Sequence, residues 1–197
     1  MQIVDVKEKW TNRINTVTIG ATKAEGGTRA KTVTVGGETT LPFLTFEGDI
    51  PNPPAIAGLV VDVVPEDWPD VLKQAIGKEI NSPVEWAQKA VRDWKVDLIC
   101  LKLLGPDPLG RNLSADHAAK TVKAVLNAVD VPLILWGCGD VQKDNEILPA
   151  CSQAARGENC LIGPATDKNY RTLAAIGKAD KHKLIGEAPV DINIAKQ

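Results

Sequence analysis

The sequence has few of the residues that usually build metal sites or catalytic sites. It contains two histidines, and none of its four cysteines belongs to a C-x-x-C pair; the cysteines are Cys100, Cys138, Cys151 and Cys160. We therefore expect no zinc or iron-sulfur site made by this chain alone. Cys100 and Cys160 lie in strand-like runs, where a thiol acts as a small apolar side chain. Cys138 lies in a predicted loop and is the one cysteine to test.

An excess of positive charge and long apolar runs are also absent. Lys and Arg total 23 against 25 for Asp and Glu, a formal net charge of -2, which argues against the basic surface that nucleic acid requires. No apolar run approaches the roughly 20 residues needed to cross a bilayer. Met1 leads into the polar Gln2 and Asp5 rather than into a signal peptide. We expect a cytoplasmic protein with neither a nucleic-acid partner nor a membrane partner.

The sequence does contain short apolar runs separated by helical patterns. The central run, Pro132 to Trp136, has no polar alternation and therefore predicts a strand buried on both faces. Similar runs occupy residues 56–64, 97–104, 160–162 and 183–187. Strands separated by helices predict parallel βαβ units, in which the loops after the strands build the binding site. Cys138 and Asp140, just after the central run, therefore lie where ligands are expected.

Helix start signals occur between these runs. A helix is expected after Ser82, because this hydroxyl cap is followed by Pro83 and, three residues after the cap, by Glu85. A helical stripe also covers residues 71–76, and residues 163–166 are predicted to form a loop after the strand at 160–162. The other predicted helix caps are Ser114, either Asp140 or Asp144, and Asp167.

Residues 1–54 differ from the rest of the chain. Segments 14–19 and 31–35 alternate apolar and polar residues, which predicts two short antiparallel strands. Prolines at 42, 51, 53 and 54 then interrupt regular structure. We predict an N-terminal β-hairpin extension with a proline-rich lead-in over residues 1–54, followed by βα units over residues 55–197.

Five βα units fit two α/β architectures. One is an open doubly wound sheet, but no connection here carries the Gly-rich phosphate signature that accompanies nucleotide binding in that fold. The other is a TIM (β/α)8 barrel, which takes about 250 residues, so that this chain would hold the first five strands and lack three. An open barrel leaves two strand edges unpaired. In that case we expect a fragment, or a partner that supplies the rest.

A dozen short motifs occur in the order found in a known family. They are residues 17–20, 36–39, 41–43, 46–48, 51–54, 86–87, 97–102, 131–134, 143–144, 157–158, 169–170 and 191–193. On these motifs the chain resembles the small subunit of the corrinoid iron-sulfur protein, also called the delta subunit of the acetyl-CoA decarbonylase/synthase complex. The resemblance covers essentially all 197 residues, although the family continues beyond the position of Gln197.

The resemblance implies a TIM barrel that pairs with a larger subunit carrying an iron-sulfur cluster and a corrinoid-binding domain. Together they would pass a methyl group on cobalt from methyltetrahydrofolate or methyltetrahydromethanopterin to acetyl-CoA synthase, in the reductive acetyl-CoA (Wood-Ljungdahl) pathway. This barrel would cover the upper face of the shared corrinoid and hold no iron-sulfur cluster itself. The implied partners are the large subunit, the methyltransferase, and acetyl-CoA synthase with CO dehydrogenase.

In this role the cobalt carries the methyl group, so the protein needs only to bind, shield and orient the macrocycle. The sequence offers no evident Ser-His-Asp set, metal-ligand cluster or pair of catalytic carboxylates. The candidate corrinoid-facing residues, all at predicted strand ends, are Lys102, Cys138, Asp140, Thr166, Asp191 and Asn193.

Structural roles compete with cofactor contact at these positions. Lys102 can emerge at the strand end or join an ion pair, and Asp140 can cap a helix. Thr166 can act as a turn residue, and Asn193 can form an ordinary hydrogen bond within a loop.

Two other functions remain open from the sequence. One is a pterin-dependent corrinoid methyltransferase on a similar barrel. It needs Asp and Asn side chains at adjacent strand ends to bind the pterin, and Asp140, Asp191 and Asn193 supply only some of them. The other is an assembly module that makes no cofactor contact.

Overall fold

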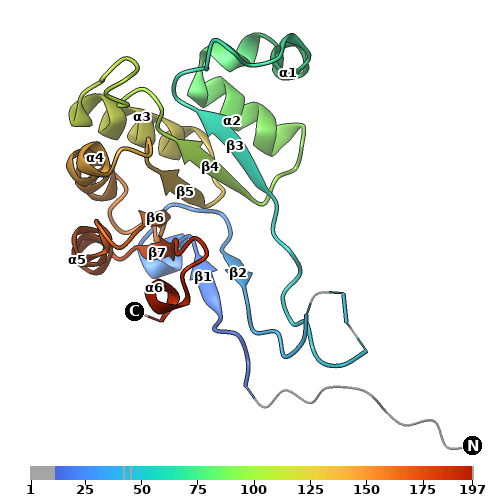
Figure 1. Ribbon diagram of the computed structural model, residues 1–197. Coiled ribbons are helices and arrows are strands. Elements are labelled where there is room, and N and C mark those ends of the chain that lie inside the picture. The colour runs from blue at the N-terminus through green and yellow to red at the C-terminus, as the bar shows by residue number, and fades with distance from the viewer. Residues whose placement is uncertain (1–11, 42, 45, 197) are drawn as a thin grey trace, which may run out of the picture.

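A computed structural model describes residues 12–41, 43–44 and 46–196, which contain two separate β-sheets (Figure 1). The smaller sheet pairs β1 (Val17–Ile19) with β2 (Val33–Val35) in antiparallel register, with the 3-10 helix η1 (Lys23–Glu25) between them. The predicted hairpin is confirmed, although its strands are shorter than the alternating segments. The first eleven residues of the predicted extension, Pro42 and Gln197 lie outside the described residues.

The larger sheet has five parallel strands, as the apolar runs predicted. They are β3 (Ala57–Val61), β4 (Leu98–Lys102), β5 (Leu133–Trp136), β6 (Leu161–Ala165) and β7 (Lys183–Gly186). The prediction that residues 163–165 belong to a loop is wrong, because β6 continues to Ala165. Its register against β7 shifts between Ile162 and Ala165, and such an irregularity lets a strand include Pro164, which has no N–H to donate.

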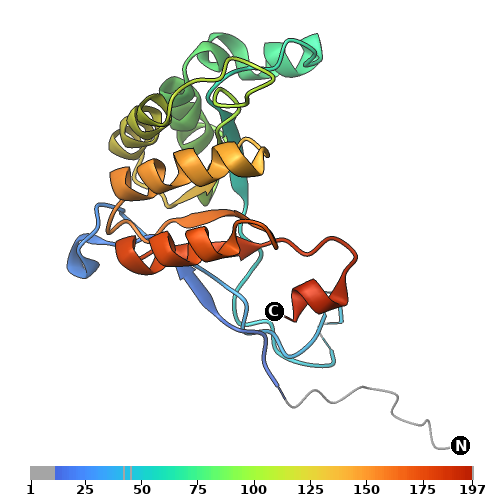
Figure 2. The ribbon, with the colours of Figure 1, turned by 60° about the vertical axis from the view of Figure 1, so that its left-hand side comes forward.

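The strands follow one another across the sheet in chain order, so the described part of the chain has no topological switch point. This order excludes a doubly wound arrangement of these five strands. Right-handed crossovers between successive strands place the connecting helices on one face, as Figures 1 and 2 show. These helices are α2 (Pro83–Arg92), α3 (Ala115–Ala128), α4 (Val141–Ala154) and α5 (Tyr170–Asp180).

The shorter helices are α1 (Asp70–Ile76) and η2 (Gly77–Asn81), which precede α2, and α6 (Ile192–Ala195), which follows β7. Within the described residues no helix combines the length and the apolar character that crossing a membrane would need.

Three predicted helix caps are confirmed. Ser82 Oγ accepts a hydrogen bond from Glu85 N at 3.3 Å, and Ser114 Oγ accepts one from His117 N at 3.2 Å. Asp140 accepts one from Lys143 N at 2.8 Å. Since each side chain satisfies an N–H that has no partner inside the helix, each fixes where its helix begins.

The prediction that Asp167 caps a helix is wrong, because α5 begins at Tyr170, directly after Asn169. The Asn169 side chain makes no cap bond; it bonds back to the end of β6 instead. Pro149 lies inside α4, which runs unbroken from Val141 to Ala154.

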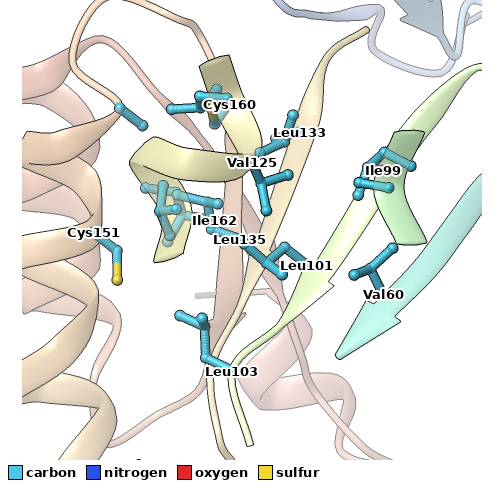
Figure 3. Packing of buried hydrophobic residues seen from close by; sticks show 14 of the residues in the cluster. Val60, Ile99, Leu101, Leu103, Val125, Leu133, Leu135, Cys151, Cys160 and Ile162 are labelled. Atoms are coloured by element: carbon cyan, nitrogen blue, oxygen red, sulfur yellow. The ribbon is translucent and has the colours of Figure 1, made fainter. Parts of the chain in front are cut away.

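The main core fills the space between the large sheet and the helices (Figure 3). Val60, Leu101 and Leu135 occupy one register row on the helix-facing side of the sheet, and all three are fully buried. Val125 and Cys151 pack against this side from α3 and α4. Truncating a buried leucine of such a core to alanine typically costs about 2–5 kcal/mol, so this layer supplies much of the fold's stability.

On the opposite side of the sheet, five residues are only partly covered and are here called the open face: Leu59, Cys100, Lys102, Ile134 and Trp136. Val61, in the same register row as Lys102, is buried. The prediction that the apolar runs are buried on both faces is wrong here, because Leu59 is 45% exposed and the other four are only half-buried. The hairpin covers only the amino-terminal part of this side, where Ile19 and Val33 pack against Leu98.

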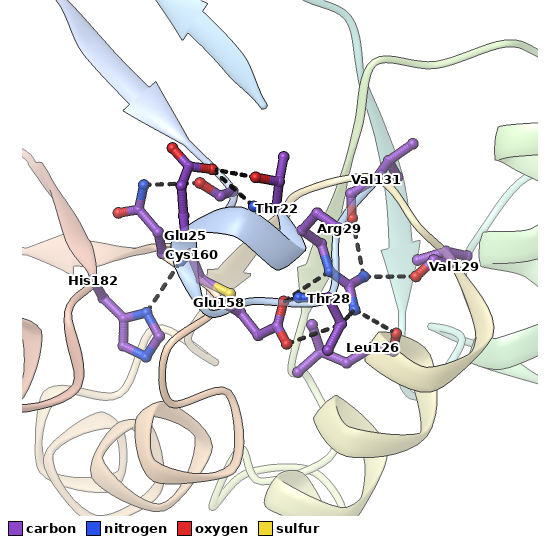
Figure 4. Close-up of polar contacts among 12 residues, drawn as sticks. Thr22, Glu25, Thr28, Arg29, Leu126, Val129, Val131, Glu158, Cys160 and His182 are labelled. Carbon is purple, nitrogen blue, oxygen red and sulfur yellow. Dashed lines mark hydrogen bonds and ion pairs between the residues drawn. The ribbon is translucent and has the colours of Figure 1, made fainter. Parts of the chain in front are cut away.

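A buried arginine ties the N-terminal segment to the βα units (Figure 4). Arg29 is 3% exposed, and its Nε donates to Glu158 Oε2 at 2.9 Å. Its Nη atoms donate to the carbonyl oxygens of Leu126, Val129 and Val131 around the end of α3. Because a guanidinium carries five fixed donors, it can join these separate elements in one contact.

Candidate functional site

The carboxyl ends of the five parallel strands lie along one edge of the sheet, here called the rim: residues 62–64, 103–105, 137–140, 166–169 and 187–191. All six residues predicted from the sequence lie at the rim or directly beside it. They are Lys102 at the end of β4, Cys138 and Asp140 after β5, Thr166 after β6, and Asp191 and Asn193 after β7. Whether any of them touches a corrinoid stays a prediction.

Asp62, which sequence reasoning did not single out, holds the rim segment after β4. Its Oδ1 accepts hydrogen bonds from Leu104 N at 2.6 Å and from Gly105 N at 2.9 Å. A Cβ on Gly105 would lie 2.8 Å from Asp62 Oδ2, so glycine lets the carboxylate come this close. Burial raises the pKa of Asp62 despite these bonds.

Asp144 holds the neighbouring segment after β5 in the same way. Its carboxylate accepts from Cys138 N at 2.8 Å and from Gly139 N at 3.2 Å, and only 2% of the residue is exposed. A Cβ on Gly137 would collide with this carboxylate. Asp144 is therefore a loop-holding residue rather than a helix cap. Burial raises its pKa, while the Cys138 thiol and backbone bonds act in the opposite direction.

Asn169 does the same for the segment after β6. Its Oδ1 accepts from Thr166 N at 2.7 Å, its Nδ2 donates to Pro164 O at 3.1 Å, and 2% of the residue is exposed. Three successive rim segments are thus each held by one side chain, of which Asp144 and Asn169 are buried and Asp62 is half-buried. No local pattern in the sequence marks these residues, because Asp62 interrupts an apolar run, and Asp144 and Asn169 come several residues after one, between polar or aromatic neighbours.

The Cys138 thiol is protonated at neutral pH. Burial raises its pKa to about 12, and the nearby Asp144 carboxylate acts in the same direction. A thiol must lose its proton to act as a nucleophile or as a metal ligand. Cys138 therefore offers the rim a small, weakly polar surface rather than a reactive thiolate.

Lys102 is the charged residue of the open face. It is half-buried at the last position of β4, beside Trp136 on β5, and it makes no ion pair with any described residue. Of the two structural roles considered, the strand-end position is confirmed, and the described residues supply no ion-pair partner.

A pocket of about 370 Å³ opens between the ends of β6 and β7. Thr166, Asp167 and Tyr170 line one side of it, Glu187 lies after β7, and Ile194 of α6 contributes from the other side. Asp191 and Asn193 do not line it. Asp191 caps α6, and Asn193 lies within α6 rather than in a loop, with its backbone N donating to Asp191 Oδ1 at 2.8 Å.

The described residues include no group of three or more His, Cys, Asp or Glu side chains placed to hold a metal ion. The rim thus presents backbone loops in fixed positions, hydroxyl and carboxylate groups, and one protonated thiol. Such a surface can bind and orient a ligand through hydrogen bonds and apolar contact.

Comparison with known proteins identifies the family. The family model described as CO dehydrogenase/acetyl-CoA synthase delta subunit matches residues 16–197. The chain belongs to this family. The resemblance found in the sequence motifs is therefore confirmed.

Relatives within this family are named acetyl-CoA decarbonylase/synthase complex subunit delta. The Archaeoglobus fulgidus protein is 38% identical over 96% of this chain and 42% of its own length. A Methanosarcina thermophila relative, subunit delta 1, is 37% identical over 96% of this chain and 43% of its own length. The Methanocaldococcus jannaschii protein is 33% identical over 96% of this chain and 46% of its own length. The chain thus spans less than half the length of these relatives.

Proposed function

We propose that this chain acts as the small subunit of a heterodimeric corrinoid methyl carrier in the reductive acetyl-CoA pathway. It covers the corrinoid while the cobalt takes a methyl group from methyltetrahydrofolate or methyltetrahydromethanopterin and passes it to acetyl-CoA synthase. Family membership over residues 16–197 carries this proposal, because the relatives are named as delta subunits of an acetyl-CoA decarbonylase/synthase complex.

We also propose that the five βα units over residues 55–197 form part of a (β/α)8 barrel, with residues 1–54 as an extension. Two observations support this: the strands follow in chain order, and all four crossover helices lie on one face. A barrel wall would also explain why the open face is largely apolar but only half-buried, since a closed barrel packs this side in its interior.

The chemistry of the rim fits a corrinoid. When bound, the corrinoid supplies a cobalt ion that accepts and releases the methyl group, so the chain has to bind, shield and orient. The held segments after β4, β5 and β6 give a fixed surface for this purpose. The proposal assigns no catalytic residue to this chain, and Lys102, Cys138, Asp140, Thr166, Asp191 and Asn193 remain the candidate contacts.

The proposed partners are a larger subunit that holds the other face of the shared corrinoid, the methyltransferase, and acetyl-CoA synthase with CO dehydrogenase. Membership in a family named for a multi-subunit complex supports these partners. All four cysteines are free thiols, as is usual in a reducing compartment, which supports a cytoplasmic location.

The decisive experiment is co-expression of the chain with its larger subunit, followed by visible spectroscopy and native mass measurement. We expect one corrinoid for each pair of subunits, and none on this chain purified alone. Purified complex without corrinoid would contradict the covering role and favour an assembly module. Methyl transfer from methyltetrahydrofolate to free cob(I)alamin by this chain alone would instead favour a methyltransferase.

A further inference from the structure

The two phenylalanines of this chain, Phe43 and Phe46, both lie on the loop between β2 and β3. This loop is here called the aromatic loop, and its described residues are 39–41, 43–44 and 46–49. Phe43 is 75% exposed and Phe46 is 61% exposed, and Leu41 on the same loop is 49% exposed. Single apolar side chains are common on protein surfaces, but large apolar side chains gathered on one short loop, two of them aromatic, are typical of a docking surface.

Hydrogen bonds close the aromatic loop at its base. Thr39 N donates to Asp49 O at 3.1 Å, and Asp49 N donates to Thr39 Oγ1 at 2.9 Å. A Cβ on Gly48 would lie 2.6 Å from Thr39 Oγ1, so glycine permits this close approach. Within the loop, Thr40 Oγ1 donates to Leu44 O at 3.0 Å. Because these bonds already order the loop, it loses little conformational freedom when a partner binds.

The stretch that contains the aromatic loop carries carboxylates but no cationic side chain. Residues 32–72 contain no Lys, Arg or His and seven acidic residues, although the chain as a whole is nearly balanced in charge. The seven are Glu38, Glu47, Asp49, Asp62, Glu66, Asp67 and Asp70.

The acidic residues beside the phenylalanines are largely unpaired. Glu38 and Glu47 make no ion pair with any described residue, and Asp49 is paired only with the exposed Arg13, at 3.8 Å. A complementary partner therefore has an apolar groove bordered by Lys or Arg. A second copy of this chain does not fit, because a symmetric contact through this loop would bring like charges together.

The aromatic loop lies away from the rim. Residues 50–56 lead from it to the amino end of β3, whereas the rim is formed by the carboxyl ends of the strands. In Figures 1 and 2 the loop projects beyond both β-sheets. A protein bound to this loop therefore leaves the rim open to the corrinoid.

We infer that the aromatic loop anchors the larger subunit by inserting Phe43 and Phe46 into an apolar groove bordered by Lys or Arg. The inference rests on the proposed function, in which the two subunits share one corrinoid while the methyltransferase and acetyl-CoA synthase take turns at the cobalt. Lasting interfaces are more apolar than transient ones. The exposed aromatic pair therefore fits the permanent partner rather than the two that exchange.

The test uses the complex of this chain with its larger subunit. A photo-reactive residue, p-benzoylphenylalanine, is introduced at Phe43, and after irradiation mass spectrometry identifies the segment to which it is joined. We expect a crosslink to a segment of the larger subunit that combines apolar residues with Lys or Arg. A crosslink within the same chain or to a second copy, or none at all, would overturn the inference.

Variants measure what the loop contributes to association. Phe43→Ala and Phe46→Ala are each expected to weaken binding of the larger subunit by on the order of thirtyfold in biolayer interferometry. The control Trp94→Ala, at an aromatic residue 45% exposed after α2, is expected to leave binding unchanged. Glu47→Lys is expected to slow association at low salt, whereas Glu85→Lys, exposed in the first turn of α2, is not. Circular dichroism verifies that each variant is folded.

The possible failures are distinguishable. Normal binding by the Phe43→Ala and Phe46→Ala variants, in a complex that still carries corrinoid, would overturn the inference and leave the proposed function intact. A complex that crosslinks through position 43 but holds no corrinoid would overturn the covering role and leave the loop as the subunit anchor. A chain that forms no complex with the larger subunit would overturn both.

Discussion

Cys138 and His182 illustrate how burial changes the chemistry of single side chains in this molecule. The two residues lie at opposite ends of the strands, Cys138 after β5 and His182 just before β7. Burial raises the pKa of the Cys138 thiol and lowers the pKa of the His182 imidazole, so each residue is kept neutral. Both shifts lead to measurable predictions.

Cys138 should react slowly with alkylating reagents. With a pKa of about 12, its thiolate fraction near pH 8 is on the order of a thousandfold below that of an ordinary cysteine. Iodoacetamide labelling followed by mass spectrometry should show this difference between the folded chain and the chain unfolded in urea. Asp144→Asn should raise the rate, because it removes the nearby negative charge. Labelling of the folded chain at the unfolded rate would contradict the assigned environment.

His182 should make the protein less stable as the pH falls. Its Nδ1 accepts from Cys160 N at 3.1 Å (Figure 4). Its Nε2 contacts Ser152 O at 3.0 Å, and the two contacts together require the neutral ring. Because burial lowers the pKa in the folded state below its usual 6.5, the unfolded chain binds the proton more readily. The contribution of the neutral His182 ring to the free energy of unfolding is therefore complete above pH 6.5. It is lost as the pH falls toward the lowered pKa of His182 in the folded state.

Urea unfolding at a series of pH values from about 8 to 5 measures this loss. His182→Gln, which cannot titrate, should show a smaller fall over the same range. An equal pH dependence for the variant and the unaltered protein would rule His182 out as the source.

Individual elements are joined by side chains that cross between them, and Arg29 is the clearest case. It comes from the segment that leads to β2, yet its partners lie at the end of α3, before β5 and before β6. The helix-terminal carbonyls that it contacts have no partner within α3, so the guanidinium satisfies groups that would otherwise be unpaired in the interior.

Arg29→Met should lower the free energy of unfolding by about 3–5 kcal/mol, because it leaves Glu158 as a buried, unpaired carboxylate. Urea denaturation measures the change. Arg29→Lys should restore only part of the loss, since an ammonium cannot reach all of these acceptors at once. Replacing both Arg29 and Glu158 by Met should be less damaging than the single change, and a loss below about 1 kcal/mol for Arg29→Met would refute the role of the ion pair.

Across the whole molecule, the two sides of the large sheet differ. Helices cover one side, whereas the other side carries the partly exposed residues of the open face and is packed by the β1–β2 hairpin at its amino-terminal part. The two outer strands of this sheet, β3 and β7, each pair with only one neighbour among the described residues. Half-buried apolar side chains next to unpaired strand edges favour association.

The 197-residue chain should therefore self-associate when it is purified without a partner. Sedimentation velocity over a wide range of concentration should show a rising mean mass. Leu59→Lys, a change on the open face, should reduce this association. The control Leu109→Lys, at a residue 98% exposed in the loop after β4, should not. A strictly monomeric chain at all concentrations would count against the open face as an association surface.

The sequence was sufficient for the parts of the fold that depend on local patterns. Strand-like runs located all five parallel strands, and Ser82, Ser114 and Asp140 marked helix starts, because capping depends on neighbours three residues away. The motifs were also sufficient for the family, since their order along the chain is a property of the sequence itself.

Tertiary structure decided what depends on contacts between distant residues. Periodicity cannot show whether both faces of a strand are covered, so the open face was missed; it depends on where helices and the hairpin pack. The loop-holding roles of Asp62 and Asp144, and the pocket shared by β6, β7 and α6, likewise arise only when separate rim segments meet. A carboxylate after a strand looks the same in sequence whether it faces water or accepts hydrogen bonds from two backbone N–H groups, and only the fold brings those groups to it.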